Sequence, residues 1–466
     1  MCQLKVSSVE PPRRTVSQYM SDGQGQIRLM GIPEVSGEVM LTGRVRYDYR
    51  AEGSRNWVKL VDYQDDQFHP LAIDATNNSL YALRKREGRY VLTQTKLASG
   101  LAETSVAANP KVDIDDVVRI GDGQRVIGYT YADDRRHTVY FDPEYKALST
   151  ALGKALPNLP IVTFVNASQD GNRILLFAGS DSDAGRYYLF DKTTKALGEI
   201  LPARPGLAGR TLAKVQSVTY PAADGTSVPA YLTLPAGKTA KGLPAVVLPH
   251  GGPSARDEWS FDWLAQFLAA RGYAVIQPNY RGSAGFGDLW LAKNGFKGWR
   301  TSIGDVSAAA RYLVWEGIAA PDRLAILGWS YGGYAALQSA ATEPSLYKAV
   351  VAIAPVTDLD MLKNDYSGYT NRRIVEEFVG SGAHIAEGSP LRRAAAITAP
   401  VLLVHGDLDA NVGVAQSQKM DSALRAAGKT SELLLFKGLD HQLEDSEARA
   451  LMLSKIGALL ERTIGH

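Results

Sequence analysis

The stretch LGWSYGGYAAL at residues 327–337 places a serine between glycines, where one structural pattern gives way to another. The apolar run RLAIL before Gly328 is typical of a buried strand, and YAALQSAA after Gly333 has helix-forming composition. Gly328 and Gly332 omit the β-carbons that would crowd a tight strand-to-helix turn. The spacing G-x-S-x-G is that of a nucleophile elbow and predicts Ser330 as an exposed nucleophile. The alternative is a glycine-rich turn without chemistry.

From about residue 211 onward, short apolar segments alternate with helical patterns. The expected strands are residues 243–252, 273–282, 323–327, 348–356, 399–407 and 432–441, and the expected helices are residues 261–272, 304–317, 334–341 and 448–462. Near-continuous apolar strands that alternate with helices indicate a parallel sheet covered on both faces. We therefore expect residues 211–466 to form one α/β domain built on a doubly wound parallel sheet.

Residues 1–210 show short alternating strands and many turns, without a convincing long helix. A loose repeat joins a Gly, Asn or Asp turn and a short strand to a second, aromatic-containing strand. The first segments are residues 21–31, 74–84, 121–131 and 168–178, and the second are residues 56–63, 89–96, 137–144 and 186–193. The period of about 45–55 residues fits one four-stranded propeller blade, which predicts a partial β-propeller of about four blades. An irregular β-sandwich is the alternative.

Composition limits the partners that the chain is expected to bind. The chain has 466 residues, long enough for two or three domains, with 45% hydrophobic and 21% charged residues. A formal net charge of +2 gives no reason to expect nucleic acid or an anionic membrane as a partner. Cys2 is the only cysteine, so no internal disulfide and no cysteine-based zinc site is predicted. We expect neither a metal nor a cofactor, and no apolar run reaches the ~18 residues of a membrane span.

The serine needs an acid and a histidine, which follow it along the chain in α/β-hydrolases. Asp407 and Asp409 both follow the strand VLLV and are the two candidates for the acid, although Asp407 could equally be a turn or cap residue. His441 follows the strand ELLLF and is predicted to take the Ser330 proton and return it to the leaving group. A solvated loop histidine is the alternative for His441. His405 ends a strand beside the acid loop and is interpreted as structural.

An oxyanion hole needs two backbone donors, one after the nucleophile and one after an early strand. The Tyr331 N–H is the first candidate. The Gly251 N–H, in the segment HGGP directly after the strand PAVVLP, is the second. Glycine permits close approach to a substrate oxygen. The alternative for HGGP is a simple glycine turn.

Six motifs occur together in a recognisable order. They are HGGP (250–253), NYRGSAGFG (279–287), GWSYGGY (328–334), APVTD (354–358), HGDLDANV (405–412) and DH (440–441). In this order and spacing the sequence resembles the prolyl oligopeptidase family of serine peptidases, and HGGP resembles its acylaminoacyl-peptidase-like branch. Other branches place an oxyanion-donating tyrosine where His250 stands, so the resemblance supports Gly251 as the donor here. The family motif also selects Asp409 over Asp407 as the acid.

The resemblance implies that the β half belongs to a seven- or eight-bladed propeller that admits only peptides. About four blades cannot close such a ring, so we expect that the first part of the chain is missing or that another chain completes it. The opening MCQLKVSSVEPPRR lacks the 7–15-residue apolar core of a signal peptide, which indicates a cytoplasmic protein as written. If the true N-terminus lies upstream, a periplasmic or secreted location is the alternative. Because the family often dimerises through its hydrolase domain, a homodimer is a further expectation.

Substrate preference is inferred from the segment 356–366, which follows the strand after the elbow and resembles the family's S1 wall. The candidate substrate-binding residues are Val356, Leu359, Leu362, Tyr366, Tyr334 and Asn411. Leucines stand where proline-selective relatives have aromatic residues, so the resemblance implies an apolar pocket without strict proline preference. Packing against the sheet is the alternative for Tyr334, and a loop turn is the alternative for Asn411. No Glu-Glu pair occurs in residues 1–210, which disfavours strict dipeptidyl release.

These inferences predict a serine-type peptidase that cleaves short peptides through an acyl-enzyme on Ser330, as an oligopeptidase, acylaminoacyl-peptidase or aminopeptidase. The first alternative is a carboxylesterase that uses the same triad on small esters. The second is a binding or assembly module whose triad is poorly productive because the propeller is incomplete.

Overall fold

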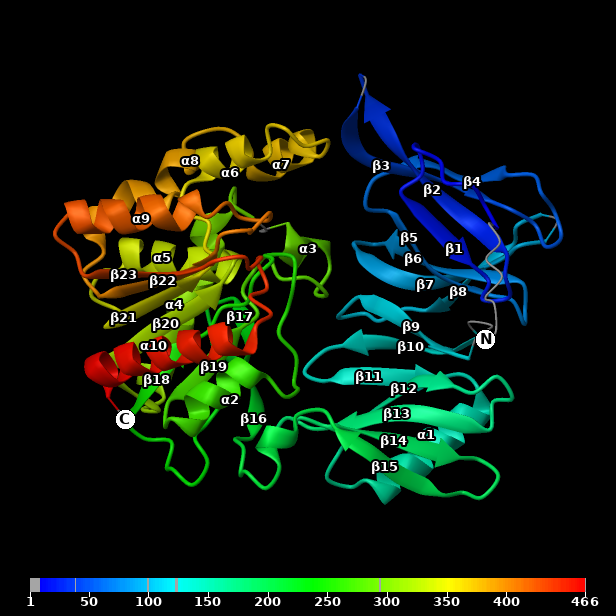
Figure 1. Ribbon diagram of the computed structural model, residues 1–466, viewed down its shortest axis with the longest axis horizontal. Helices are drawn as coiled ribbons and strands as arrows, with labels where there is room; N and C mark the ends of the chain where they lie inside the picture. The colour runs from blue at the N-terminus through cyan, green and yellow to red at the C-terminus, as the bar shows by residue number, and fades with distance from the viewer. Residues whose placement is uncertain (1–8, 38, 99, 122–124, 293–294, 466) are drawn as a thin grey trace, which may run out of the picture. The chain divides into compact units, whose positions relative to one another are not determined.

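The computed structural model of the protein describes residues 9–37, 39–98, 100–121, 125–292 and 295–465 (Figure 1). Cys2, residues 1–8 of the opening segment considered for a signal peptide, and part of the third repeat turn (122–124) lie outside the described residues. The chain divides into two compact units between Ala208 and Gly209. Each unit has its own hydrophobic core and is described by itself.

Among its described residues, the first unit consists of four antiparallel sheets that follow one another in chain order (Figure 1). The first sheet contains β1 (Gln18–Ser21), β2 (Ile27–Ser36), β3 (Met40–Tyr49) and β4 (Val58–Gln64), and the second β5 (Phe68–Asp74), β6 (Ser79–Arg86), β7 (Arg89–Lys96) and β8 (Glu103–Ala107). The third contains β9 (Ile114–Ile120), β10 (Arg125–Ala132) and β11 (Arg136–Tyr140), and the fourth β12 (Ile161–Ala167), β13 (Arg173–Gly179), β14 (Arg186–Asp191) and β15 (Leu197–Pro202). A short 3-10 turn, η1 (Pro205–Leu207), follows. Most apolar residues that alternate along these strands are buried between successive sheets.

The third sheet has three strands, and a helix follows it in place of a fourth. The sequence pattern predicted a strand through residue 144 and no long helix, but the chain forms α1 (Pro143–Ala155). The Asp142 side chain accepts a hydrogen bond from the Tyr145 N–H, and Pro143 occupies the first helical position, where its missing N–H costs nothing. Tyr145 and Leu152 then bury one face of α1 in the core of the unit.

A buried arginine links the first sheet to the second. The Arg28 side chain is 1% exposed. Its Nε donates to the Arg50 carbonyl at 2.8 Å, and its Nη2 donates to Asn78 Oδ1, in the turn between β5 and β6, at 2.7 Å. Asp22 Oδ2 lies 3.8 Å from Nη1 and balances the charge. The first two sheets are therefore joined by polar contacts as well as by apolar packing.

Replacing Arg28 by methionine is expected to lower the free energy of unfolding of the first unit by about 3 kcal/mol, because the buried Asp22 carboxylate and the half-buried Asn78 side chain would lose their partner. Urea unfolding followed by circular dichroism measures the change. Arg173→Met is the matched control, because Arg173 is exposed and its nearest carboxylate oxygen, on Asp191, is 3.9 Å away. Equal losses in the two variants would contradict the linking role of Arg28.

The second unit is built on one eight-stranded sheet with the order β16-β17-β19-β18-β20-β21-β22-β23. Its strands are β16 (Val215–Pro221), β17 (Ser227–Thr233), β18 (Leu243–Val247), β19 (Ala274–Pro278), β20 (Ala319–Trp329), β21 (Ala349–Ile353), β22 (Val401–Gly406) and β23 (Ser431–Phe436). The last six in the chain pair in parallel, as predicted. The antiparallel β16–β17 hairpin at one edge was not predicted.

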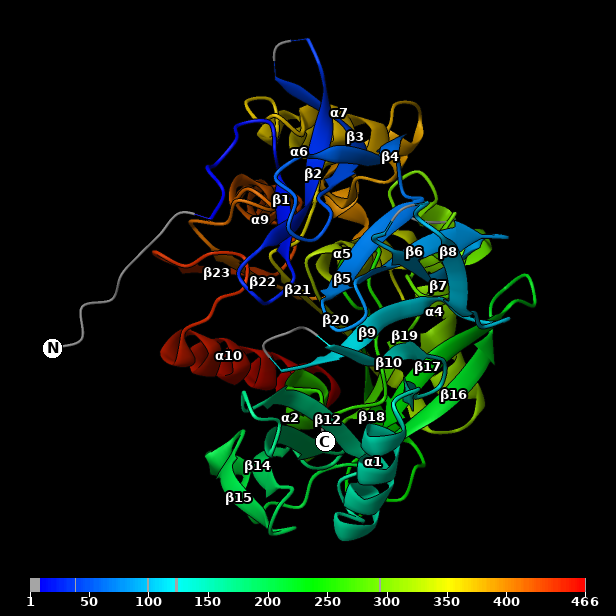
Figure 2. The same cartoon turned by 90° about the vertical axis from the view of Figure 1, so that its right-hand side faces the viewer.

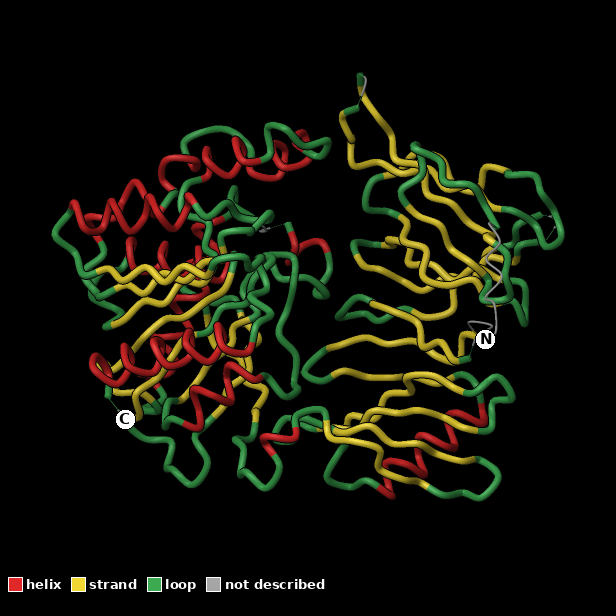
Figure 3. The backbone as a smooth tube through the Cα atoms, in the orientation of Figure 1, coloured by secondary structure: helices red, strands yellow, loops and turns green. Residues whose placement is uncertain are grey.

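Helices cover both faces of this sheet (Figures 2 and 3). Residues of α2 (Trp263–Ala270) and α10 (Ser446–Ile464) pack in one hydrophobic cluster, and residues of α4 (Trp299–Trp315), α5 (Tyr331–Thr342) and α9 (Ala415–Ala426) pack in the other. The remaining helical segments are α3 (Asp288–Leu291), α6 (Leu359–Asp365), α7 (Arg372–Val379), α8 (His384–Glu387) and η2 (Pro390–Ala396). Within the described ranges, no helix has both the length and the apolar character that a membrane span needs.

Candidate active site

Ser330 stands at the corner between β20 and α5 with φ 60° and ψ −121°. This left-handed backbone conformation is strained for a residue that carries a side chain, and such strain commonly marks functional sites. A β-carbon added to Gly328 would lie 2.1 Å from the Gly332 carbonyl oxygen, and one added to Gly332 would lie 2.2 Å from the Pro249 carbonyl oxygen. Both glycines of the motif are thus required by close backbone approach.

Two loops bring a carboxylate and a histidine together. Asp409 follows β22 and His441 follows β23, so both come from the carboxyl ends of parallel strands, as Ser330 does. His441 Nδ1 lies 2.6 Å from Asp409 Oδ2. The Asp407 carboxylate instead accepts the Gly438 N–H at 2.6 Å and closes a local turn. Of the two acids, Asp409 is therefore the one in contact with His441.

The Asp409 carboxylate is buried but fully supplied with donors. Its Oδ1 accepts the N–H groups of Asn411 and Val412 at 2.8 and 2.9 Å. Burial raises the pKa of Asp409, but hydrogen bonds from His405 and His441 outweigh this effect and hold the pKa well below its usual range. Asp409 is therefore an anion at neutral pH and can stabilise a positive charge on His441.

The residue before the serine holds the histidine loop. Trp329 Nε1 donates to the His441 carbonyl at 3.0 Å, so the loop is tied to the end of β20. Among the described residues, no hydrogen bond joins the Ser330 hydroxyl to His441. Hydrogen bonds of this kind often tighten only when substrate is bound.

The backbone of HGGP lies directly against the serine. A β-carbon built on Gly251 would lie 3.1 Å from the Trp329 carbonyl oxygen, a tight contact, and 3.4 Å from Ser330 Cβ, an ordinary van der Waals distance. The Tyr280 hydroxyl donates to the His250 carbonyl at 2.8 Å and so orients the peptide group that carries the Gly251 N–H. Tyr331 is the first residue of α5, where N–H groups have no acceptor within the helix. The backbones of Gly251 and Tyr331 thus both lie beside the nucleophile.

His250 is an uncharged side chain that holds this loop through hydrogen bonds. Its Nδ1 lies 2.7 Å from the Gly251 carbonyl, which can only accept, so Nδ1 carries the proton. Its Nε2 lies 2.8 Å from Ser283 Oγ, and the Ser283 hydroxyl itself donates to the Tyr280 carbonyl at 2.7 Å. Burial lowers the pKa of His250 from 6.5 to about 4, so the ring stays neutral near pH 7.

The free energy of unfolding is expected to fall as the pH drops from about 6.5 to about 4, because unfolded His250 binds a proton in this range and folded His250 does not. The contribution of this one residue reaches at most about 3 kcal/mol. Chemical denaturation of the parent protein and of His250→Gln at pH 7.0 and 4.5 measures it. The variant should lose less stability on acidification, and equal losses would contradict the assignment.

Comparison with known proteins shows which protein family the sequence around this site resembles. Residues 259–466 match the family model described as the prolyl oligopeptidase family. The chain carries a prolyl oligopeptidase family domain. It is 31% identical over 348 residues to dipeptidyl aminopeptidase BIII of Pseudoxanthomonas mexicana. The aligned region covers 69% of this chain and 50% of that protein. The chain is 28% identical over 218 residues to the acylamino-acid-releasing enzyme of Rattus norvegicus, which covers 45% and 30% respectively. The chain thus spans about half or less of the length of these relatives.

Solved structures agree with the fold of the prolyl oligopeptidase family. A puromycin-hydrolyzing peptidase from Mycobacterium tuberculosis superposes with a TM-score of 0.78 at 21% identity, covering 98% of this chain and 71% of that one. The acylaminoacyl peptidase of Pyrococcus horikoshii gives a TM-score of 0.74 at 17% identity, covering 97% and 71%. At these identities the likeness shows the fold alone. The predicted fold class, a propeller-type β domain followed by an α/β-hydrolase domain, is confirmed.

The structure places four of the predicted substrate-binding residues of the family domain in its hydrophobic core. Val356 and Leu362 are buried, and Leu359 and Tyr334 are 0% exposed. Tyr334 packs edge-on against Phe296 with ring centroids 5.1 Å apart. These four side chains offer almost no surface to a substrate. All four pack in the core, as the alternative for Tyr334 predicted.

The other two predicted substrate-binding residues lie together at the acid loop. The Tyr366 hydroxyl donates to the Asn411 carbonyl at 3.1 Å. Asn411 is exposed, and its own N–H donates to Asp409. The backbone of Asn411 thus forms hydrogen bonds within the acid loop, in agreement with a loop-turn role. Its side chain is exposed.

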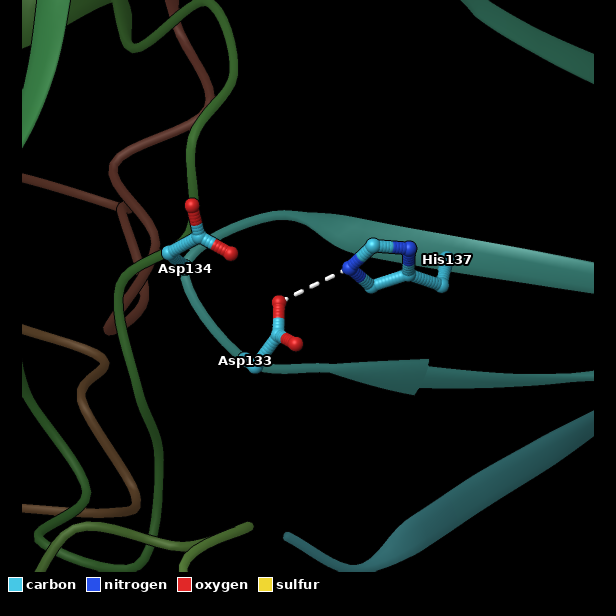
Figure 4. Close-up of side chains that lie close together, drawn as sticks. All are labelled: Asp133, Asp134 and His137. Atoms are coloured by element: carbon cyan, nitrogen blue, oxygen red, sulfur yellow. Dashed lines mark hydrogen bonds and ion pairs between the residues drawn. The ribbon is translucent and has the colours of Figure 1, made fainter. Parts of the chain in front are cut away.

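The described residues also contain a group of potential metal ligands in the first unit, away from the predicted site residues in sequence. Asp133, Asp134 and His137 lie around the turn between β10 and β11 (Figure 4). His137 Nε2 lies 2.8 Å from Asp133 Oδ1. Burial raises the pKa of Asp133, but hydrogen bonds with Asp134 and His137 more than offset this and lower it to about 2. The three groups pair with one another, and we assign no ligand to them.

Proposed function

We propose that this chain is a serine peptidase that hydrolyses peptide bonds of short peptides through an acyl-enzyme on Ser330. One observation carries the proposal. An elbow serine, a histidine–carboxylate pair and a glycine backbone against the serine come together at the carboxyl ends of neighbouring parallel strands. Ligands bind at this edge of open α/β sheets. The names of the relatives, dipeptidyl aminopeptidase and acylamino-acid-releasing enzyme, support a peptide as the substrate.

The hydrogen bond to Asp409 decides how His441 can act. A carboxylate only accepts, so His441 Nδ1 carries the proton and Nε2 is left as the base. In the first step Nε2 takes the Ser330 proton while Ser330 Oγ forms a bond to the scissile carbonyl carbon. The carbonyl oxygen becomes an oxyanion between the N–H groups of Gly251 and Tyr331, each of which contributes about 3 kcal/mol.

The second half of the reaction returns each proton. The tetrahedral intermediate collapses when His441 Nε2–H protonates the leaving nitrogen and the C–N bond breaks, which leaves an ester on Ser330. Water then loses a proton to Nε2 and attacks the ester carbon. Collapse of this second intermediate releases the carboxylic acid and restores the Ser330 hydroxyl. These reaction steps require no metal and no redox cofactor.

The finer parts of the proposal concern substrate and assembly. We propose no strict preference for proline at the cleaved position, because the sequence carries leucines at 359 and 362, where the resemblance expects aromatic residues in proline-selective relatives, and both leucines are buried in the core. We also propose that the hydrolase unit forms a homodimer, which light scattering after size-exclusion chromatography would detect as twice the chain mass. The proposed bounds of the two domains are residues 1–210 for the propeller-type domain and residues 211–466 for the hydrolase domain.

The function is tested by a matched substrate panel with Ser330→Ala as the blank. The panel contains acetyl-alanyl, alanyl-alanyl and glycyl-prolyl anilides beside a short-chain nitrophenyl ester. Cleavage of at least one anilide that is lost in the blank is the expected result. The preferred anilide then separates acylaminoacyl, dipeptidyl and proline-directed release.

Two other outcomes would replace the proposal. Ester cleavage without anilide cleavage would identify a carboxylesterase that uses the same triad, because esters react more readily than amides. No cleavage of either class would leave the binding or assembly module that the sequence also allowed.

A further inference from the structure

His405 is a second histidine on the candidate catalytic acid. It is the fifth residue of β22 and its side chain is 0% exposed. Its Nε2 lies 2.9 Å from the Val412 carbonyl and 3.2 Å from Asp409 Oδ2, and its Nδ1 lies 2.7 Å from Ser417 Oγ. A fully buried histidine therefore bridges α9 and the acid loop.

These partners fix which nitrogen of His405 carries the proton. The Val412 carbonyl can only accept a hydrogen bond, so Nε2 is the protonated nitrogen. The same Nε2–H also faces Asp409 Oδ2. Nδ1 must then accept, and the buried Ser417 hydroxyl is its donor. The chain of donation runs from Ser417 to His405 to Asp409.

Asp409 meets a donor at every position that its two oxygens offer. Oδ1 is held by the backbone of its own loop, through the N–H groups of Asn411 and Val412. Oδ2 receives His441 Nδ1–H from one side and His405 Nε2–H from the other. His405 is thus the side chain that fixes, from the protein interior, the oxygen on which the orientation of His441 depends.

We propose that His405 is a positioning residue, which locks the side-chain rotamer of Asp409 so that Oδ2 presents one fixed acceptor to His441. The inference rests on the proposed function, because the fixed acceptor matters when His441 becomes an imidazolium in the reaction. A misplacement of about 1 Å in such a constellation can cost about 100-fold in rate. His405 touches neither substrate nor reacting atoms and acts only through Asp409.

The test compares His405→Leu, which removes the donor, with His405→Gln, whose amide N–H can replace Nε2–H. Rates are expressed per active serine, titrated with a fluorophosphonate, so that unfolded protein does not count. In His405→Leu, kcat should fall about 10- to 100-fold while KM changes less than about threefold, because a transition-state interaction is lost. His405→Gln should recover most of kcat. His384→Leu is the matched control, since His384 Nε2 bonds only to the Val379 carbonyl among the contacts described for it.

Ser417→Ala keeps the histidine and removes the donor to Nδ1, which covers the case in which His405→Leu does not fold. Its kcat should fall about 3- to 10-fold without loss of titratable serine. The inference is overturned if Ser417→Ala matches the parent kcat, or if a folded His405→Leu does so. Loss of kcat in His405→Gln equal to that in His405→Leu would overturn it as well.

Failure of the proposed function would be recognised separately. If the parent protein hydrolyses no substrate while Asp409 and His441 are intact, the function fails, and the low-field proton resonance of the His441–Asp409 hydrogen bond decides on His405. A resonance that His405→Leu shifts or broadens, and that His405→Gln retains, supports the positioning role. The same resonance in the parent and in His405→Leu overturns it.

Discussion

Ser330→Ala is expected to lower kcat/KM for the best substrate by at least about 10,000-fold, with KM little changed where residual activity can be measured. The reason is chemical, because alanine keeps the strained backbone of the elbow but has no atom that can form the acyl-enzyme. The purified variant is assayed with the substrate that the parent protein prefers. Labelling by a fluorophosphonate, followed by peptide mass spectrometry, should mark Ser330 in the parent and no residue in the variant.

Ser422→Ala provides the matched control for this substitution. Ser422 lies on α9 and its hydroxyl donates to the Gln418 carbonyl within the same helix. The control should retain parent activity within about twofold, since exposed substitutions away from the site rarely matter. If Ser330→Ala kept a tenth or more of the parent rate and the label moved to another serine, the elbow would not be the nucleophile.

The elbow could be predicted because its cause is local. The requirement for glycine two residues either side of Ser330 comes from backbone atoms a few residues away or from the loop packed beside them. The same holds for the parallel strands, whose unbroken apolar runs report burial on both faces. Chain order then indicated His441, and the family pattern chose Asp409, which contacts it.

The buried residues of the segment 356–366 show where a one-dimensional pattern cannot decide. An apolar residue that lines a pocket and one that fills a core have the same composition, and only the packed structure separates them. Leu359 was expected in a pocket and is 0% exposed. The helix α1 was missed for a related reason. The predicted strand was extended to residue 144, past the Asp142–Pro143 cap that marks the start of the helix.

The supporting residues of the site depend on contacts between distant parts of the chain. The Trp329 indole reaches the His441 carbonyl across 112 positions, and Tyr280 reaches the His250 carbonyl across 30. His405 was interpreted as structural from its place at the end of a strand. The sequence placed it beside the acid loop, but only the fold shows that its Nε2 faces Asp409.

Asp409→Asn is expected to lower kcat by about 10,000-fold, whereas Asp407→Asn should lower it by less than about 10-fold. An asparagine at 409 has one carbonyl oxygen for four N–H donors. Whichever way its amide is turned, its NH₂ group faces either the backbone N–H groups of Asn411 and Val412 or the two histidines. If the NH₂ faces His441, Nδ1 must accept, the proton moves to Nε2, and the base that Ser330 needs is lost.

Asp407→Asn is the matched control because it changes the same atoms in the same loop. Its Oδ1 accepts the Gly438 N–H, which an asparagine oxygen can also do. The kinetics of both variants are measured from pH 5 to 9 and expressed per serine titrated with the fluorophosphonate. Because the hydrogen bonds hold the pKa of Asp409 well below its usual range, protonation of Asp409 should not contribute to the parent profile between pH 5 and 9. A large loss of kcat in Asp407→Asn with near-parent kcat in Asp409→Asn would make Asp407 the acid. The hydrogen bonds from Ser417 through His405 to Asp409 would then have no part in catalysis.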